Sequence, residues 1–179
     1  MNYGNSSDYN CTSLHWACIN GNIEIVKLLI QDKRVDVNKQ DIWRSTPFWL
    51  ACLYDHTEVV KLLIQDQRVD VNKQNINGQT PFWYACENGK TEVVKYMMQY
   101  ERVDVNKQAN GGYTPFWYAC RNGHTEVVKH MMQDERVDVN KPNNNNATHL
   151  DSKSRRSHPS RPSYSSIRKI YRPRRKREI

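Results

Sequence analysis

The feature that most constrains this chain is a 34-residue period. Closely related words of seven residues, TPFWLAC, TPFWYAC and TPFWYAC, begin at Thr46, Thr80 and Thr114, and a weaker copy, TSLHWAC, begins at Thr12. Two further words, TEVVK (IEIVK in the first copy) and VDVN, recur in the same phase. A fixed period of this size predicts a tandem array in which each unit packs on the next. One such unit is too short to bury its apolar side chains alone, so stacked units share one elongated core.

Each unit reads as a turn, a helix, a second turn and a second helix. Thr followed by Pro favours a helix start, because the hydroxyl caps a free backbone N–H and Pro loses no hydrogen bond there. Asn-Gly at 88–89 and 122–123 is typical of the end of that helix. The apolar run at 59–64 then supplies the core side of the second helix. The pattern predicts an all-α solenoid of four helix-turn-helix units.

These words resemble the signature of ankyrin repeats, T-P-L-H-x-A, which residues 46–51 and their later copies match. The resemblance covers about residues 3–150. It implies β-hairpin fingers between units, with VDVN at the start of each finger. The expected ankyrin-repeat domain is 1–150, followed by a tail at 151–179. Its units span about 8–41, 42–75, 76–109 and 110–143, with a partial fifth unit to 150.

The chain departs from the family pattern at three places. Trp49, Trp83 and Trp117 replace the usual His, which survives only as His15, so the family's Thr–His hydrogen bond is expected in one unit. The glycine that ends the outer helix is replaced by QDKR and related words. Arg44 replaces the finger glycine kept at 78 and 112, so a distorted turn is expected there.

The array begins a fifth unit and does not continue it. Thr148 and Leu150 keep the phase, but no helical apolar pattern follows Asp151. We therefore expect the last complete unit to lack the polar cap that terminal repeats need, which would allow self-association through exposed apolar residues. These residues are Val127, Val128, Met131 and Met132.

The positive charge of the chain lies in its tail. Residues 151–179 hold 11 of the 27 Lys and Arg but 2 of the 19 Asp and Glu. The tail has few apolar residues, so it is expected to be disordered. Its cluster RPRRKR is of the kind that nuclear import receptors (importins) read or that nucleic acid attracts, although a merely solvated end is an equal alternative. The cluster comprises Arg172, Arg174, Arg175, Lys176 and Arg177.

No stretch of the sequence has the composition of a secretory signal or a membrane span. We therefore expect an intracellular protein, cytoplasmic or nuclear.

Several groups of residues could form a chemical site, and each also has a structural interpretation. Four cysteines share one repeat position, where small buried hydrophobes are expected rather than disulfides, because neighbouring units are too far apart for a bridge. Cys11, His15 and Cys18 could supply three zinc ligands, but a structural zinc site needs four. The tryptophan row favours packing between units over a ligand-stacking ladder. No catalytic motif or cofactor loop is present, so we predict no enzyme, no cofactor and no metal.

Resemblance to ankyrin proteins implies a scaffold that binds a protein partner on its concave side, through finger tips and inner-helix ends. Trp43, Tyr54 and Tyr113 are the expected main contributors, because aromatic residues dominate interface energies. The alternative is a nucleic-acid or anionic-surface binder acting through the basic tail. The expected finger contacts are Ile42, Trp43, Ser45, Ile76, Asn77, Gln79, Asn110, Gly111 and Tyr113. The expected helix-end contacts are Leu53, Tyr54, Glu87, Asn88, Arg121 and Asn122.

Overall fold

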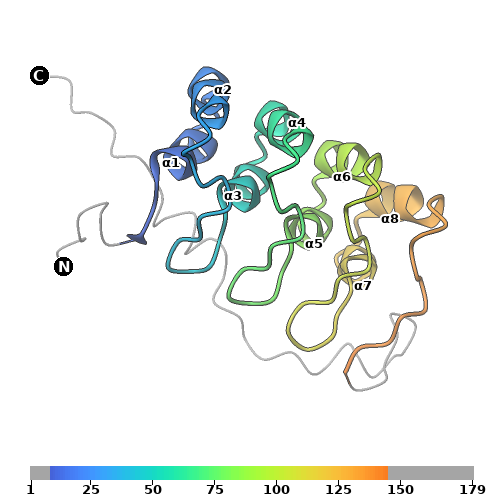
Figure 1. Cartoon of the computed structure of the whole chain (residues 1–179). Coiled ribbons are helices and arrows are strands. Elements are labelled where there is room, and N and C mark those ends of the chain that lie inside the picture. Colours follow the sequence, from blue (N-terminus) through green and yellow to red (C-terminus); the bar gives the residue numbers. More distant parts are fainter. Residues whose placement is uncertain (1–8, 145–179) are drawn as a thin grey trace, which may run out of the picture.

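The computed structural model describes residues 9–144, in which eight helices form four consecutive pairs (Figure 1). Residues 1–8 and 145–179 lie outside this description, so the partial fifth unit beyond 144 and the basic tail stay sequence-based predictions. The pairs are α1 (Ser13–Ile19) with α2 (Ile23–Gln31), α3 (Pro47–Tyr54) with α4 (Thr57–Gln65), α5 (Pro81–Glu87) with α6 (Thr91–Met98), and α7 (Pro115–Arg121) with α8 (Thr125–Met132).

The helices stack in two rows. The first helices of the pairs, α1, α3, α5 and α7, contact one another in order, and α2, α4, α6 and α8 do the same alongside them. The loops that join successive pairs project together to one side (Figure 1). The helical solenoid predicted from the period is confirmed.

The β-hairpin fingers are not confirmed, because no residue between 9 and 144 is in a strand. Each loop closes instead as a tight turn. In the first, Asp41 N donates to Ser45 O (3.0 Å) and Arg44 N donates back to Asp41 O (3.0 Å). Equivalent pairs of bonds close the loops at 75–79 and 109–113. The fingers are therefore narrow turns rather than paired strands.

The Thr-Pro words start helices as predicted. The side chains of Thr46, Thr80 and Thr114 accept hydrogen bonds from backbone N–H groups three residues on, at 3.0–3.1 Å. Pro occupies the first turn of α3, α5 and α7. In α1, Thr12 and His15 form a capping box instead. Helix starts thus repeat where the sequence repeats.

The main core runs the length of the array between the two rows of helices. Phe48 and Phe82 are almost completely buried in it, as are the valines of the outer helices α4 and α6. At the C-terminal end Val127 (1% exposed) and Met131 (0%) are also buried, so the prediction that both would be exposed is wrong. They pack on the preceding unit, and of the four apolar residues in question only Met132 (66%) is left bare.

The cysteines behave as small hydrophobes. Cys18, Cys52 and Cys86 are buried and all three are free thiols, as the packing interpretation predicted. Burial raises the pKa of each well above its usual range. Cys120 is half-buried, and burial raises its pKa to about 11. Because the thiolate is the reactive form, none of these four is poised as a nucleophile.

Candidate protein-binding surface

In the first two fingers, one polar side chain at the base of the loop fixes the turn. Asp41 Oδ1 accepts from the backbone N–H groups of Trp43 and Ser45, both at 2.8 Å. In the next finger Asn75 Oδ1 accepts from the corresponding groups, at 2.9 and 3.0 Å. The third finger has Ala109 at this place and two adjacent glycines, 111 and 112, both with positive φ. Short polar side chains that bond to nearby backbone are a usual way to fix a turn.

The first finger is not distorted, which corrects the expectation drawn from Arg44. Arg44 adopts φ 60°, close to the 71° of Gly78 and the 78° of Gly112, and it closes the turn with the same backbone bond. Glycine is required in the later fingers for a second reason. A Cβ on Gly78 would overlap Asn110 Oδ1, and one on Gly112 would overlap Asn144 Oδ1.

Backbone hydrogen bonds tie each finger tip to the next. Ile76 N donates to Trp43 O (2.8 Å), and Asn110 N donates to Asn77 O (3.1 Å). The first tip is held in the same way by Tyr9 O, which accepts from Ile42 N (3.2 Å). The tips therefore form one continuous row, and the side chains that they carry keep fixed spacing.

The expected contact residues fall into three classes of exposure. Ile42, Ile76, Asn88, Asn110, Gly111, Arg121 and Asn122 are exposed. Trp43, Tyr54, Asn77 and Glu87 are half-buried. Ser45 (4%), Leu53 (0%), Gln79 (0%) and Tyr113 (7%) are buried.

Two of these four buried residues, Gln79 and Tyr113, make side-chain contacts within their own units. Gln79 accepts a hydrogen bond from the Asn75 side chain (3.2 Å), and the ring of Tyr113 packs against that of Trp117 (4.4 Å between centroids). They support the surface from beneath, so a partner would meet the residues around them.

The inner-helix ends carry a second exposed strip. Asn122 Nδ2 donates to Glu87 O (2.8 Å) across the boundary between the third and fourth units, and the Lys90 ammonium pairs with Asp55 (2.7 Å) across the preceding boundary. Arg121 lies over the ring of Trp117, with its guanidinium carbon 5.2 Å from the ring centroid. Cation–π contact of this kind holds the side chain while leaving its charge in solvent.

The tryptophan row packs between units, as the packing interpretation predicted. Trp49 (1% exposed) lies against Tyr84, and Trp83 (0%) against Tyr118, with ring centroids 4.9 and 4.5 Å apart. Trp83 Nε1 also donates to Tyr113 O in the next unit (2.9 Å). These rings form no exposed ladder for a stacked ligand.

His15 keeps the family's Thr–His bond and makes the same inter-unit contact as Trp83. Its Nδ1 lies 2.8 Å from Thr12 Oγ1, and its Nε2 lies 3.3 Å from Ser45 O, which is equivalent to Tyr113 O. Burial lowers the pKa of His15 to about 4. In the third unit Trp83 therefore takes the place of His in the inter-unit bond, although not in the bond to Thr.

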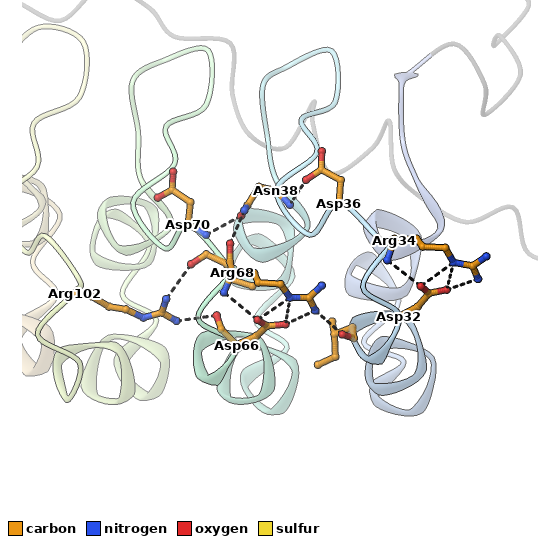
Figure 2. A network of polar contacts seen from close by, with 10 residues as sticks. Asp32, Arg34, Asp36, Asn38, Asp66, Arg68, Asp70 and Arg102 are labelled. Atoms are coloured by element: carbon orange, nitrogen blue, oxygen red, sulfur yellow. Dashed lines mark hydrogen bonds and ion pairs between the residues drawn. The ribbon is translucent and has the colours of Figure 1, made fainter.

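Sequence reasoning missed a polar ladder along the loops that follow the outer helices (Figure 2). Asn38 Nδ2 donates to Arg68 O (2.6 Å), and Asn38 Oδ1 accepts from Asp70 N (2.7 Å). Asn72 and Asn106 make the same two bonds to their following units. The signal was present in the sequence, since VDVN is identical in all four copies although its Asn is polar.

The arginine of the QDxR word completes this ladder. Arg68 is held by both carboxylate oxygens of Asp66 and reaches back to donate to Ile30 O, in the last turn of the preceding outer helix. Arg102 and Arg136 reach Ile64 O and Met98 O in the same way. A guanidinium at a helix C-terminus satisfies a free carbonyl and complements the helix dipole. This arginine therefore takes over the capping role of the missing glycine.

No group of three or more His, Cys, Asp or Glu side chains within 9–144 is placed to hold a metal ion. No helix of the described part is long and apolar enough to cross a bilayer. The basic cluster at 172–177 lies outside the described residues.

The comparisons with known proteins agree with the repeat architecture. The family description "Ankyrin repeats (3 copies)" matches residues 1–75 and 48–143. The chain therefore belongs to the ankyrin-repeat family, whose members are generally protein–protein interaction modules. A search of curated proteins finds no match.

Proposed function

We propose that this chain is a non-enzymatic scaffold that binds a protein partner along the row of finger tips and the adjoining inner-helix ends. The observation that carries the proposal is the contrast between a repeated framework and a varied surface. The tips are tied together by backbone bonds, yet the residue at equivalent tip positions changes from Trp43 to Asn77 to Gly111. A rigid surface with unit-specific side chains suits selective recognition, because little ordering entropy is lost on binding.

The apolar part of this surface lies on the first two fingers. Ile42 is 48% exposed and Ile76 is 54% exposed, and the half-buried Trp43 lies between them in the row. Scattered exposed apolar side chains are ordinary, but two on adjacent tips beside an aromatic ring favour a contact site. Tyr54, at the end of α3, extends the same side. Tyr113 is buried and is better regarded as a support for the third finger.

The test is a double variant, Ile42→Glu with Ile76→Glu, in the full chain. Both side chains are about half exposed and stand on turns outside the helices, so helical content and thermal stability should change little. Proteins captured from cell extract by the wild type should be lost by the double variant, because a partner cannot desolvate two carboxylates without pairing them. Glu92→Ala, on the exposed face of α6, serves as control and should capture the same proteins. Unchanged capture by the double variant would place the site elsewhere.

A second candidate function is contact with nucleic acid or another anionic surface through the tail. It is favoured by the charge imbalance, since 11 of the 27 basic residues lie in 151–179. Neutralising the cluster at 172–177 by Gln substitution should abolish salt-sensitive binding to DNA or RNA and leave binding through the fingers intact. The dependence of affinity on salt should become shallower in proportion to the charges removed. The same variant would also test an importin contact, by following the accumulation of a fluorescent fusion in the nucleus.

A further inference from the structure

The two ends of the described array present the two halves of one interior junction. Inside the array, Val59 of α4 packs on the preceding unit and is 1% exposed. The equivalent residue of the first unit, Ile25, is 44% exposed, and Leu28 on the next turn is 68% exposed. At the other end Met132 of α8 is 66% exposed, whereas the equivalent Ile64 is completely buried.

The polar groups of the two ends are complementary as well. Arg34 occupies the place of Arg68, but 91% of its side chain is exposed and, among the residues that the structure describes, it pairs only with Asp32. Within residues 9–144, no guanidinium reaches the carbonyl of Met132, although the equivalent carbonyls of three preceding outer helices each receive one. The position 34 residues beyond Arg136 is Ile170. The 34-residue register therefore places no arginine opposite that carbonyl.

The asparagine ladder ends in the same way. Asn140 is equivalent to Asn38, Asn72 and Asn106 and is exposed, while the interior amides bridge to the following unit. The groups that such an amide would bind, Arg34 O and Asp36 N, stand at the opposite end of the array. An exposed cationic donor thus lies at one end, and a helix C-terminus with an uncapped carbonyl and an exposed amide lies at the other end of the described residues.

We propose that the C-terminal face of one copy stacks on the N-terminal face of a second copy, so that the solenoid continues across molecules. The occupant of each face is a second copy of this chain, because that copy offers the apolar helix face, the guanidinium and the amide in the spacing that the interior junctions use. The contact is head-to-tail and does not close on itself, so it generates open chains of increasing length. It leaves the finger tips uncovered, and is therefore independent of the proposed partner binding.

The test compares two singly blocked variants of the full chain, Leu28→Glu and Met132→Glu, by sedimentation equilibrium. Both side chains are about two-thirds exposed, so the fold should persist, and thermal unfolding checks this. The wild type should show an average mass that rises with concentration. Each variant alone should be monomeric, since burying an unpaired carboxylate weakens the contact by about 100-fold. Mixed together, the two should form a 1:1 dimer and nothing larger, because each variant retains one open face.

A milder variant sharpens the assignment. Arg34→Ala should weaken association by about tenfold without changing thermal stability, because Asp32 is its one ion-pair partner among the described residues of its own copy. A wild type that stays monomeric at all accessible concentrations would overturn the proposal. So would self-association of Leu28→Glu on its own, which would instead indicate symmetric pairing of two C-terminal faces. Leu28→Glu should still capture the partner, so failure here is separable from failure of the finger-tip proposal.

Discussion

Interior and terminal units share many residues in the same register but give them different surroundings. Asn72 bridges to two backbone groups of the next unit, whereas Asn140 is exposed. Gly89 lies under the ring of His124, whereas no atom of the described part of the chain lies within 4 Å of a Cβ placed on Gly123. The difference teaches that the role of a residue here is set by the neighbouring unit more than by its own. Substituting one repeat position in two units therefore isolates the contribution of the junction.

The largest expected effect concerns His15, which is confined to the first unit. Its pKa is lowered to about 4 by burial, while the unfolded chain has the ordinary value near 6.5. Between these values the unfolded chain binds a proton that the folded chain does not. The free energy of unfolding is therefore unaffected by His15 above about pH 6.5. It decreases as the pH falls toward 4, by ~3 kcal/mol in total.

Urea unfolding of the wild type and of His15→Trp, at several pH values between 7 and 4, measures this effect. Trp is the residue that the other three units carry at this position, and Trp83 makes the equivalent inter-unit bond. The variant should lose the part of the pH dependence that lies between 6.5 and 4. Equal slopes for the two proteins would contradict the assignment to His15.

The asparagine ladder should distinguish interior from end directly. Asn72→Ala removes two hydrogen bonds, to Arg102 O (2.7 Å) and from Asp104 N (2.9 Å). We expect a loss of ~2 kcal/mol in the free energy of unfolding, since one of the two groups can recover a bond from water. Asn140→Ala, measured by the same chemical denaturation at low protein concentration, should change stability by less than ~0.5 kcal/mol. Equal losses would mean that the amide acts within its own loop.

The helix-end glycines offer a second matched pair. Gly89 (φ 66°) and Gly123 (φ 74°) share the left-handed conformation, so Ala at either should cost ~1 kcal/mol. A Cβ on Gly89 would also lie 2.5 Å from His124 Nδ1 and displace the ring, whose Nε2 lies 2.8 Å from Glu87 O. Thermal unfolding of Gly89→Ala should therefore show an additional loss of ~1 kcal/mol. In a His124→Ala background the two substitutions should become equivalent.

The sequence predicts features that are set within one unit better than features that depend on the neighbouring unit. The helix pairs, the Thr caps and the buried cysteines follow from the period and from local propensity, and all are confirmed. The distortion at Arg44 was predicted wrongly. A glycine is demanded at position 78 by Asn110 above it, and Ile76 stands in the equivalent place above Arg44. At both turns, the residue that decides whether a side chain fits lies in the following unit.

The candidate surface was only partly predictable for the same reason. Finger and helix-end positions could be located by register, but their exposure could not. The fingers fold back on their own bases, which buries Gln79 beside Asn75 and Tyr113 against Trp117. The contacts of Arg68, Arg102 and Arg136 with the preceding outer helices were not predicted, because the family pattern indicates only that a glycine is missing there.

The smallest expected effect comes from the unit in which the ladder is incomplete. Arg68 and Arg136 each form an ion pair with the aspartate two residues earlier, but the third unit has Tyr100 at that position. As a result Arg102 Nε is buried without a hydrogen-bond partner among residues 9–144, and the Tyr100 hydroxyl pairs with that of Tyr96 instead (3.0 Å). Tyr100→Asp should supply the missing acceptor.

The gain should be small because one contact replaces another. A carboxylate bond to a half-buried guanidinium is worth about 1.5–3 kcal/mol, and loss of the tyrosine ring pair costs about 0.5–1.5 kcal/mol, which leaves a net stabilisation of ~1 kcal/mol at pH 7. The pKa values of Asp66 and Asp134 are lowered mainly by hydrogen bonds from their arginines. The carboxylate introduced by Tyr100→Asp would lie two residues before Arg102 in the same way, so its pKa should be lowered as well. Its contribution should be present above the ordinary aspartate pKa near 3.9 and lost as the pH falls through the lowered value.

Two comparisons separate the carboxylate from the removal of the ring in that experiment. Tyr100→Ala lacks both contacts and should be the least stable of the three variants in urea unfolding. Tyr100→Asn offers a neutral acceptor and should fall between Tyr100→Ala and Tyr100→Asp, because charge-assisted hydrogen bonds are about twice as strong as neutral ones. If Tyr100→Asp is no more stable than Tyr100→Asn, the guanidinium of Arg102 is already satisfied by the carbonyls of the preceding unit, and the aspartates of the other units serve their own turns rather than the junction.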